Sequence, residues 1–156
     1  MTEKKRMTEN NKGMTLIVKT ITRFTVGLIL LYGIYIVLHG HLTPGGGFAG
    51  GVIIALSFIH LMLAFGREAA LKKVSRPIAG LFESIGAVMF LVIAIIGFAG
   101  GYFFLNFFVN KGTPFNLFSG GIIPLCNIAI SLKVGAGLFA IFTALVLLKV
   151  SSKGEK

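Results

Sequence analysis

The chain has 156 residues, of which 55% are hydrophobic and only 13% are charged, and its mean hydropathy is +0.90. A soluble domain of this length has too little interior for so much apolar surface, which excludes an ordinary soluble fold and favours an integral membrane protein. The formal net charge of +10 suggests nucleic-acid binding, but the basic residues flank apolar blocks and form no stripe interleaved with aromatic side chains, a pattern typical of membrane topology.

Residues 1–20 are polar and basic, and we predict that they form a cytoplasmic tail before the first spanning helix. They could pass for the start of a signal peptide, but no small-residue cleavage site follows the apolar stretch. The first helix, from about Thr22 to Leu38, is therefore expected to remain uncleaved. The four-helix membrane domain is expected to cover residues 21–150, and residues 151–156 form a second cytoplasmic tail.

The segment 39–51, HGHLTPGGGFAGG, is the most unusual part of the chain, because it places two histidines, a proline and several glycines between apolar blocks. The glycines from Gly45 to Gly50 match the pattern G-x-G-x-x-G. The dinucleotide fingerprint also needs a preceding strand and a later acidic residue for the ribose, and both are missing here. A tight turn and close helix packing explain these glycines better.

His39 and His41 alternate in this segment and raise the question of a metal site. No carboxylate or thiol lies nearby in the sequence to complete one, and the single cysteine, Cys126, lies in an apolar run and is interpreted as a small buried hydrophobe. We therefore predict hydrogen-bonded or proton-handling histidines, no metal site and no bound cofactor.

The second helix is expected from about Phe48 to Phe65, and the third from just after Pro77 to about Phe104. Both carry small residues along one face, which allows helices to approach closely. We predict that these faces meet each other or a neighbouring subunit, and packing elsewhere within the chain is the alternative. The two faces consist of Gly50, Ser57, His60 and Ala64, and of Gly80, Glu83, Ala87, Phe90, Ala94, Gly97 and Gly101.

Glu83 is the one carboxylate that we place within a spanning helix, about 9 Å beyond Pro77 at 1.5 Å per residue. Acidic residues inside a membrane are costly and indicate function, and the alternative is an interfacial Glu that reaches water or pairs with Arg67 or Arg76. His60 is expected at a similar depth on the antiparallel second helix. We therefore predict that His60 and Glu83 form a pair or a water-linked proton relay.

The connection from about Leu105 to Lys133 contains prolines and glycines, yet much of it is apolar. A solvated loop would be more polar, so part of this connection is expected to be re-entrant or buried in protein. The fourth helix is expected from about Val134 to Val150. Lys133 at its start either reaches to the membrane interface or holds the acid of a neighbouring subunit.

The basic residues divide unequally between the two sides of these four helices. Only Lys111 and Lys133 fall on one side, and the positive-inside rule then places both termini in the cytoplasm. The predicted fold class is an all-α integral membrane protein with four transmembrane helices and a partly buried or re-entrant connection before the last. The basic residues on the other side are Lys4, Lys5, Arg6, Lys12, Lys19, Arg23, Arg67, Lys72, Lys73, Arg76, Lys149, Lys153 and Lys156.

Two motifs give the chain a family resemblance. HGHLTPGGGFAGG, and LFSGGIIPLCNIAISLKVGAGLF before and within the fourth helix, resemble the B subunit of multisubunit Na+/H+ antiporters of the Mrp type and its counterparts in archaeal membrane-bound hydrogenases and sulfur reductases. The resemblance extends from about Thr22 to Leu148. It marks as motif residues His41, Pro44, Gly45, Gly46, Gly47 and Phe48, and then Pro124, Asn127, Lys133 and Gly137.

The resemblance implies an accessory, non-redox subunit of the cell membrane that helps to form or seal a Na+/H+ translocation path. Its implied partners are other antiporter subunits, the lipid bilayer and, in some complexes, a hydrogenase-like redox arm. The ion-path candidates are Glu83, His60, His41, His39 and Lys133. A purely structural packing subunit between larger subunits is the alternative. An enzyme is not expected, because no nucleophile and base or complete metal site is present.

Overall fold

The computed structural model describes residues 14–66, 76–106, 109–110, 112–117 and 119–154. Its four long helices are α2 (Leu16–Leu38), α3 (Gly46–Phe65), α5 (Arg76–Ala99) and α6 (Ile123–Gly154), and the described residues form no strand. Each helix contains a span of 20 to 25 residues that is long and apolar enough to cross a bilayer. The predicted all-α, four-span membrane fold is confirmed.

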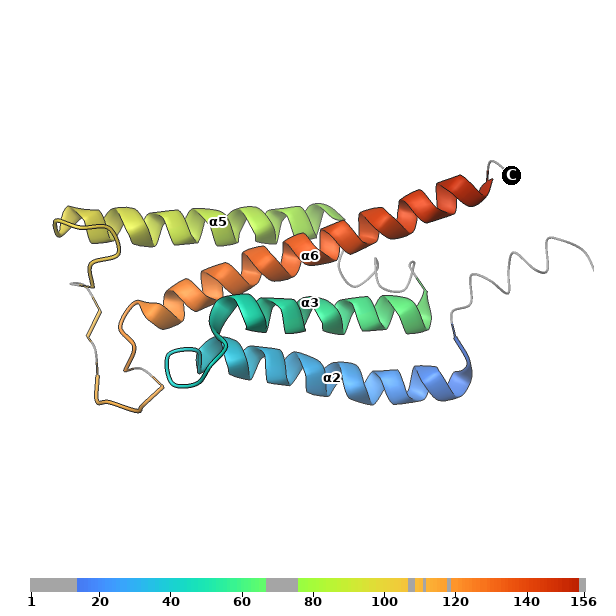
Figure 1. Cartoon of the computed structure of the whole chain (residues 1–156), viewed down its shortest axis with the longest axis horizontal. Helices are drawn as coiled ribbons and strands as arrows, with labels where there is room; N and C mark the ends of the chain where they lie inside the picture. The colour runs from blue at the N-terminus through green and yellow to red at the C-terminus, as the bar shows by residue number, and fades with distance from the viewer. Residues whose placement is uncertain (1–13, 67–75, 107–108, 111, 118, 155–156) are drawn as a thin grey trace, which may run out of the picture.

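The helices lie side by side in the order α5, α6, α3 and α2 (Figure 1). The last helix, α6, packs against both α3 and α5, and α2 packs mainly against α3. The start of α2 and the end of α6 lie at the same end of the bundle, which we call the tail end. The opposite end, which we call the turn end, holds the glycine-rich turn and the long connection between α5 and α6.

The second and third predicted helices are α3 and α5. We predicted that their small residues meet each other, but they do not, because α6 lies between α3 and α5. A methyl group added at Gly50 would lie 3.0 Å from the carbonyl oxygen of Gly33 in α2. One added at Gly51 would lie 2.9 Å from the carbonyl oxygen of Ser131 in α6. Gly50 and the adjacent Gly51 therefore pack within the chain, the alternative that we had left open, whereas contact of the two faces with a neighbouring subunit stays a prediction.

The last helix begins at Ile123, well before the predicted Val134. Prolines are tolerated in the first turn of a helix, where the N–H group has no intrahelical acceptor, so Pro124 starts this helix and does not mark a loop. Conversely, α5 ends at Ala99, before the predicted Phe104, and Gly101 follows in a left-handed conformation with φ 117°. The connection is therefore shorter than predicted.

The connection is partly buried, as predicted. Gly121 and Ile122 are buried beside the start of α6, whereas Phe115 is 90% exposed. Membrane orientation remains a prediction, because many of the basic residues that support it lie outside the described residues. These residues are Lys4, Lys5, Arg6, Lys12, Arg67, Lys72, Lys73, Lys111 and Lys156.

Candidate functional site

A charged pair joins α5 and α6 in the middle of the bundle. The Lys133 ammonium nitrogen lies 3.6 Å from Oε1 of Glu83. At 1.5 Å per residue, Lys133 is about 15 Å from the start of its span at Ile123 and about 21 Å from its end at Leu147. Both charges therefore lie well inside the apolar part of the bundle.

Glycines in the two helices make this contact possible. A methyl group added at Gly86 would lie 2.7 Å from the carbonyl oxygen of Ala129 and 2.8 Å from the backbone nitrogen of Lys133, so α5 and α6 approach closely there. A methyl group added at Gly137 would lie 3.7 Å from Oε1 of Glu83. Gly137, one turn after Lys133, thus leaves room for the carboxylate beside the helix.

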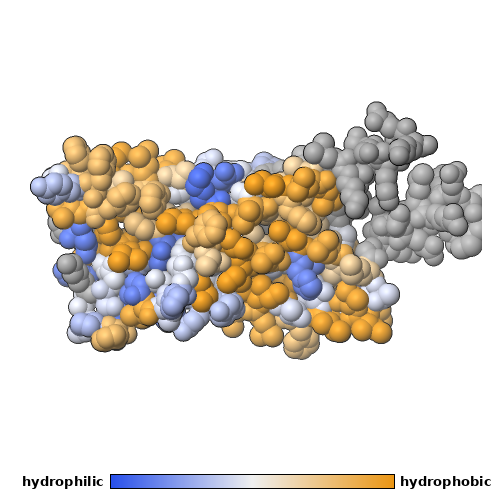
Figure 2. Space-filling view, in the orientation of Figure 1, coloured by the Kyte–Doolittle hydropathy of each residue, from blue (hydrophilic) through white to orange (hydrophobic). Residues whose placement is uncertain are grey.

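The pair lies on the outer surface of the bundle. The Lys133 and Glu83 side chains are 53% and 42% exposed. On the face shown in Figure 2, a hydrophilic patch over the middle of α5 has hydrophobic surface on both sides. Hydrocarbon solvates charged groups poorly, so this surface requires water or another protein as its neighbour.

His60 lies elsewhere and has a different partner from the predicted one. Its Nε2 atom is 3.4 Å from the hydroxyl oxygen of Thr22, a long hydrogen bond between α3 and α2, and Thr22 is only 1% exposed. The helix α6 separates His60 from α5, so the direct pairing of His60 with Glu83 that we predicted does not form. The structure instead pairs Glu83 with Lys133.

The two histidines of the turn end both bind backbone. His39 donates from Nδ1 to the carbonyl oxygen of Tyr35 at 3.0 Å and stacks on the Tyr35 ring, and His41 donates from Nε2 to the carbonyl oxygen of Asn116 at 3.2 Å. His41 therefore connects the glycine-rich turn to the long connection. Among the described residues, no three His, Cys, Asp or Glu side chains gather as metal ligands would.

Asn127 holds the glycine-rich turn against α6. Its side-chain oxygen accepts a hydrogen bond from the backbone N–H of Gly47 at 3.2 Å, and Asn127 is only 9% exposed. Gly45 and Gly46 have φ values of 147° and 82°, a region that favours glycine. Gly46 and Gly47 are buried, whereas Pro44 and Phe48 are exposed, so the family motif combines packing residues with surface residues.

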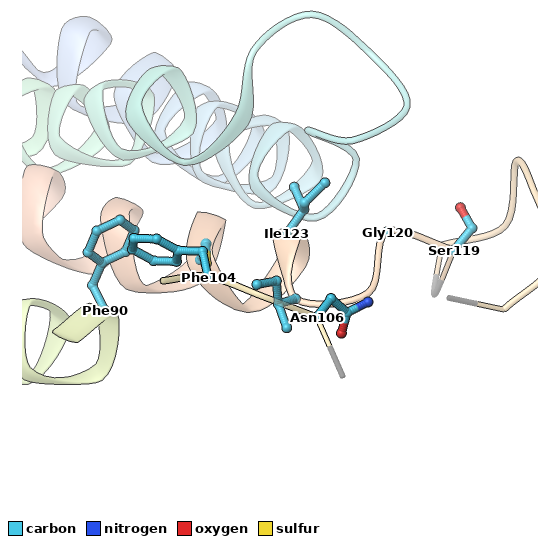
Figure 3. Close-up of a pocket in the computed structure, with 8 residues that line it drawn as sticks. Phe90, Phe104, Asn106, Ser119, Gly120 and Ile123 are labelled. Carbon is cyan, nitrogen blue, oxygen red and sulfur yellow. The ribbon is translucent and has the colours of Figure 1, made fainter. Parts of the chain in front are cut away.

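A cavity of about 550 Å³ lies at the turn end between α5, the connection and α6 (Figure 3). Phe90 and Phe104 line one part of it, and Asn106 and Ser119 contribute polar groups. The side-chain oxygen of Asn106 is buried without a hydrogen-bond partner, as are Nδ1 of His41 and Nδ2 of Asn127. Buried polar atoms of this kind are commonly satisfied by ordered water.

Three residues that the sequence did not single out help to form these contacts: Thr22, Gly86 and Asn106. Thr22 is one of several threonines in its helix, so only the fold identifies it as the partner of His60. Gly86 lies outside the small-residue stripe that we followed along the third helix. A lone glycine inside a helix often has a packing reason, and this signal could have identified Gly86.

The chain matches one family model and several known proteins over most of its length. A family model described as a domain related to the MnhB subunit of Na+/H+ antiporter matches residues 17–140. An uncharacterized protein of Methanocaldococcus jannaschii is 40% identical over 139 residues, which cover 83% of this chain and 53% of that protein. A Staphylococcus aureus protein named as antiporter subunit mnhB2 is 38% identical over 91 residues, which cover 58% of this chain and 63% of that protein.

One solved structure is similar in both fold and sequence. A chain in the membrane-bound sulfane sulfur reductase, described as an archaeal respiratory membrane complex, superposes with a TM-score of 0.73 at 31% identity. The match covers 88% of this chain and 62% of that one. The chain thus spans less than two thirds of the length of each of these three relatives.

Proposed function

Because the chain belongs to the family of domains related to the MnhB subunit of Na+/H+ antiporters, we propose that it is an accessory membrane subunit of a multisubunit cation/proton antiporter module. In this role it has no redox centre of its own and works beside other antiporter subunits, either in a free-standing antiporter or attached to a redox complex. The structural match to a chain of a respiratory membrane complex supports the second setting.

The pair of Glu83 and Lys133 is the observation that supports a role in ion movement. Both charges lie inside apolar spans and remain half-exposed, a placement that a purely structural pair buried in the bundle would not need. A carboxylate beside an ammonium can release and rebind a proton or a Na+ ion as its neighbour moves. We therefore assign the pair to the Na+/H+ path.

Glu83→Gln tests this assignment, because it removes the charge and keeps the shape. We expect Na+/H+ antiport in inverted membrane vesicles, measured per assembled complex, to fall by about tenfold or more, since an amide cannot exchange a proton or hold a cation as a carboxylate does. Antiport is measured per assembled complex because Gln leaves the Lys133 ammonium without its counter-charge, which lowers the stability of the subunit.

Thr25→Val is the matched control for this experiment. Thr25 lies inside the span of α2, and its hydroxyl donates only to the carbonyl oxygen of Ile21 in the same helix. Removing this polar group should leave antiport unchanged. Wild-type antiport in Glu83→Gln would refute the assignment and favour the alternative, a subunit that only packs between larger ones.

His60 is a second candidate for the path, and its partner Thr22 allows a more specific test. We expect His60→Ala to lower antiport several-fold without dispersing the complex. Thr22→Val keeps the shape of the side chain and removes the hydroxyl that faces His60. If Thr22→Val alone reproduces the loss, His60 depends on this contact for its orientation; normal antiport in both variants would remove His60 from the path.

A further inference from the structure

The surface around Glu83 and Lys133 has features that the ion pair alone does not explain. Small residues line the side of α5 and α6 that carries the pair, which we call the flank. They are Gly80, Ser84 and Ala87 on α5, and Gly137, Ala140 and Ala144 on α6. Their spacings of three and four residues place each set on one helix face. A methyl group added at Gly80 would meet no atom within 4 Å, so this flank is open to a neighbour.

The charges exclude lipid as that neighbour. Lys133 is about 15 Å from the nearer end of its span, further than a lysine side chain can extend to reach an interface. Hydrocarbon against a half-exposed ammonium and carboxylate would be costly. The small residues on either side of the pair instead give a second helix room to lie against both α5 and α6.

Lys133 also lacks acceptors. An ammonium has three N–H donors, and 3.6 Å is longer than the 2.7–2.9 Å typical of a charge-assisted hydrogen bond. In the described part of the chain, Glu83 is its one charged partner. Lys133 is the more exposed member of the pair, so its ammonium group faces the surroundings of the bundle.

We propose that this flank binds a transmembrane helix of another subunit, which places small residues against α5 and α6 and a carboxylate opposite Lys133. The proposal rests on the proposed function, because it requires a hetero-oligomeric complex. A second copy of this chain fits less well. The chain has five acidic residues, and Glu83 is the one that falls within a span, where it is already paired.

The opposite flank of the same two helices provides a contrast. There an apolar groove of about 250 Å³ runs between α3, α5 and α6, lined by residues such as Phe58, Phe82 and Phe139. The described residues that line it include no charged side chain. The proposal therefore concerns only the flank that carries the pair.

A charge exchange tests the proposal. Glu83→Lys combined with Lys133→Glu keeps the pair within the chain and the net charge, but turns a carboxylate toward the partner helix. We expect co-purification of the partner subunits to fall at least about tenfold because like charges then face each other. The isolated subunit should melt at the wild-type temperature in detergent, which shows that folding is intact.

Co-purification of the exchanged variant at the wild-type level would overturn the proposal, whatever its antiport rate. The proposed function is judged separately, from the antiport rate of assembled complexes that carry Glu83→Gln. The two ideas can therefore fail independently.

Crosslinking supplies a test that does not depend on charge exchange. In the full complex, with Cys126→Ser as background, Ala87→Cys labelled with a benzophenone maleimide is expected to crosslink to another subunit on illumination. Ile85→Cys is the matched control, because it lies two residues away and therefore on the opposite side of α5. Crosslinks only to lipid or to a second copy of the chain from position 87 would overturn the proposal, as would equal crosslinking to that subunit from both positions.

Discussion

Gly47→Val is expected to prevent the subunit from accumulating in the membrane. A Cβ atom at this position would lie 2.8 Å from the Cα atom of Asn127 and 2.9 Å from the Cβ atom of Ile130, and closer still to the carbonyl oxygen of Asn127. These atoms belong to α6 and cannot rotate away as a flexible side chain would. Overpacking typically costs about 1–3 kcal/mol, and we expect a value at or above the upper end because backbone is the obstacle.

The same substitution also removes a specific contact. As α3 is pushed away from α6, the hydrogen bond from the Gly47 N–H group to Asn127 is lost, and the buried amide oxygen has no partner. An unsatisfied buried polar group adds about 1–3 kcal/mol. Together these losses approach the stability of a typical domain, about 5–15 kcal/mol.

Immunoblots of membranes and thermal melting in detergent measure the effect. Gly27→Val is the matched control, because a Cβ atom at Gly27 in α2 meets no atom within 4 Å. This control should accumulate normally. Equal accumulation of the two variants would mean that the glycine-rich turn does not pack against α6 as described.

The glycine-rich segment shows what a sequence can predict. Its glycines indicated a tight turn and close helix packing, and both are present: Gly45 and Gly46 have positive φ values, and Gly47 lies against Asn127. A positive φ and a close approach both require glycine locally, so the residue type alone indicates them. The partner of the turn was not predictable in this way, because Asn127 lies 80 residues further along the chain.

Helix limits were predictable where composition changes abruptly. The first three helices end or begin near charged residues, glycines or prolines, and most of their limits were close to the observed ones. The last helix was predicted too short, because we interpreted Pro124 and the glycines before it as part of a loop. That error placed Lys133 at a helix start, where a lysine can reach water, and so its position inside a span was not predicted.

Spans were easier to predict than the positions of single residues relative to one another. His60 lies near the tail end of α3, whereas Glu83 lies in the middle of the bundle beside Lys133. Which helices pack together depends on the whole bundle, and α6 inserts between α3 and α5. The family resemblance, which the family model confirms, marked Lys133 and Gly137 as motif residues, and the structure places both beside Glu83.

Lys133→Met is expected to destabilise the subunit strongly, because it leaves Glu83 as an uncompensated charge inside a span. Methionine keeps the unbranched apolar stem of the side chain and removes the ammonium. A charge at the centre of a transmembrane helix costs about 2.5–3.5 kcal/mol on insertion scales. We expect lower amounts of the variant in membranes and a lower melting temperature in detergent.

Combining Lys133→Met with Glu83→Gln should restore most of this stability, because no charge then remains without a partner. A neutral replacement of an ion pair is often no less stable than the pair itself, whereas removal of one partner is costly. The double-mutant cycle therefore separates two roles: stability should recover in the double variant, and antiport should not. Additive losses of stability would show that Lys133 and Glu83 do not compensate each other, and recovery of antiport together with stability would show that the pair serves only to hold α5 against α6.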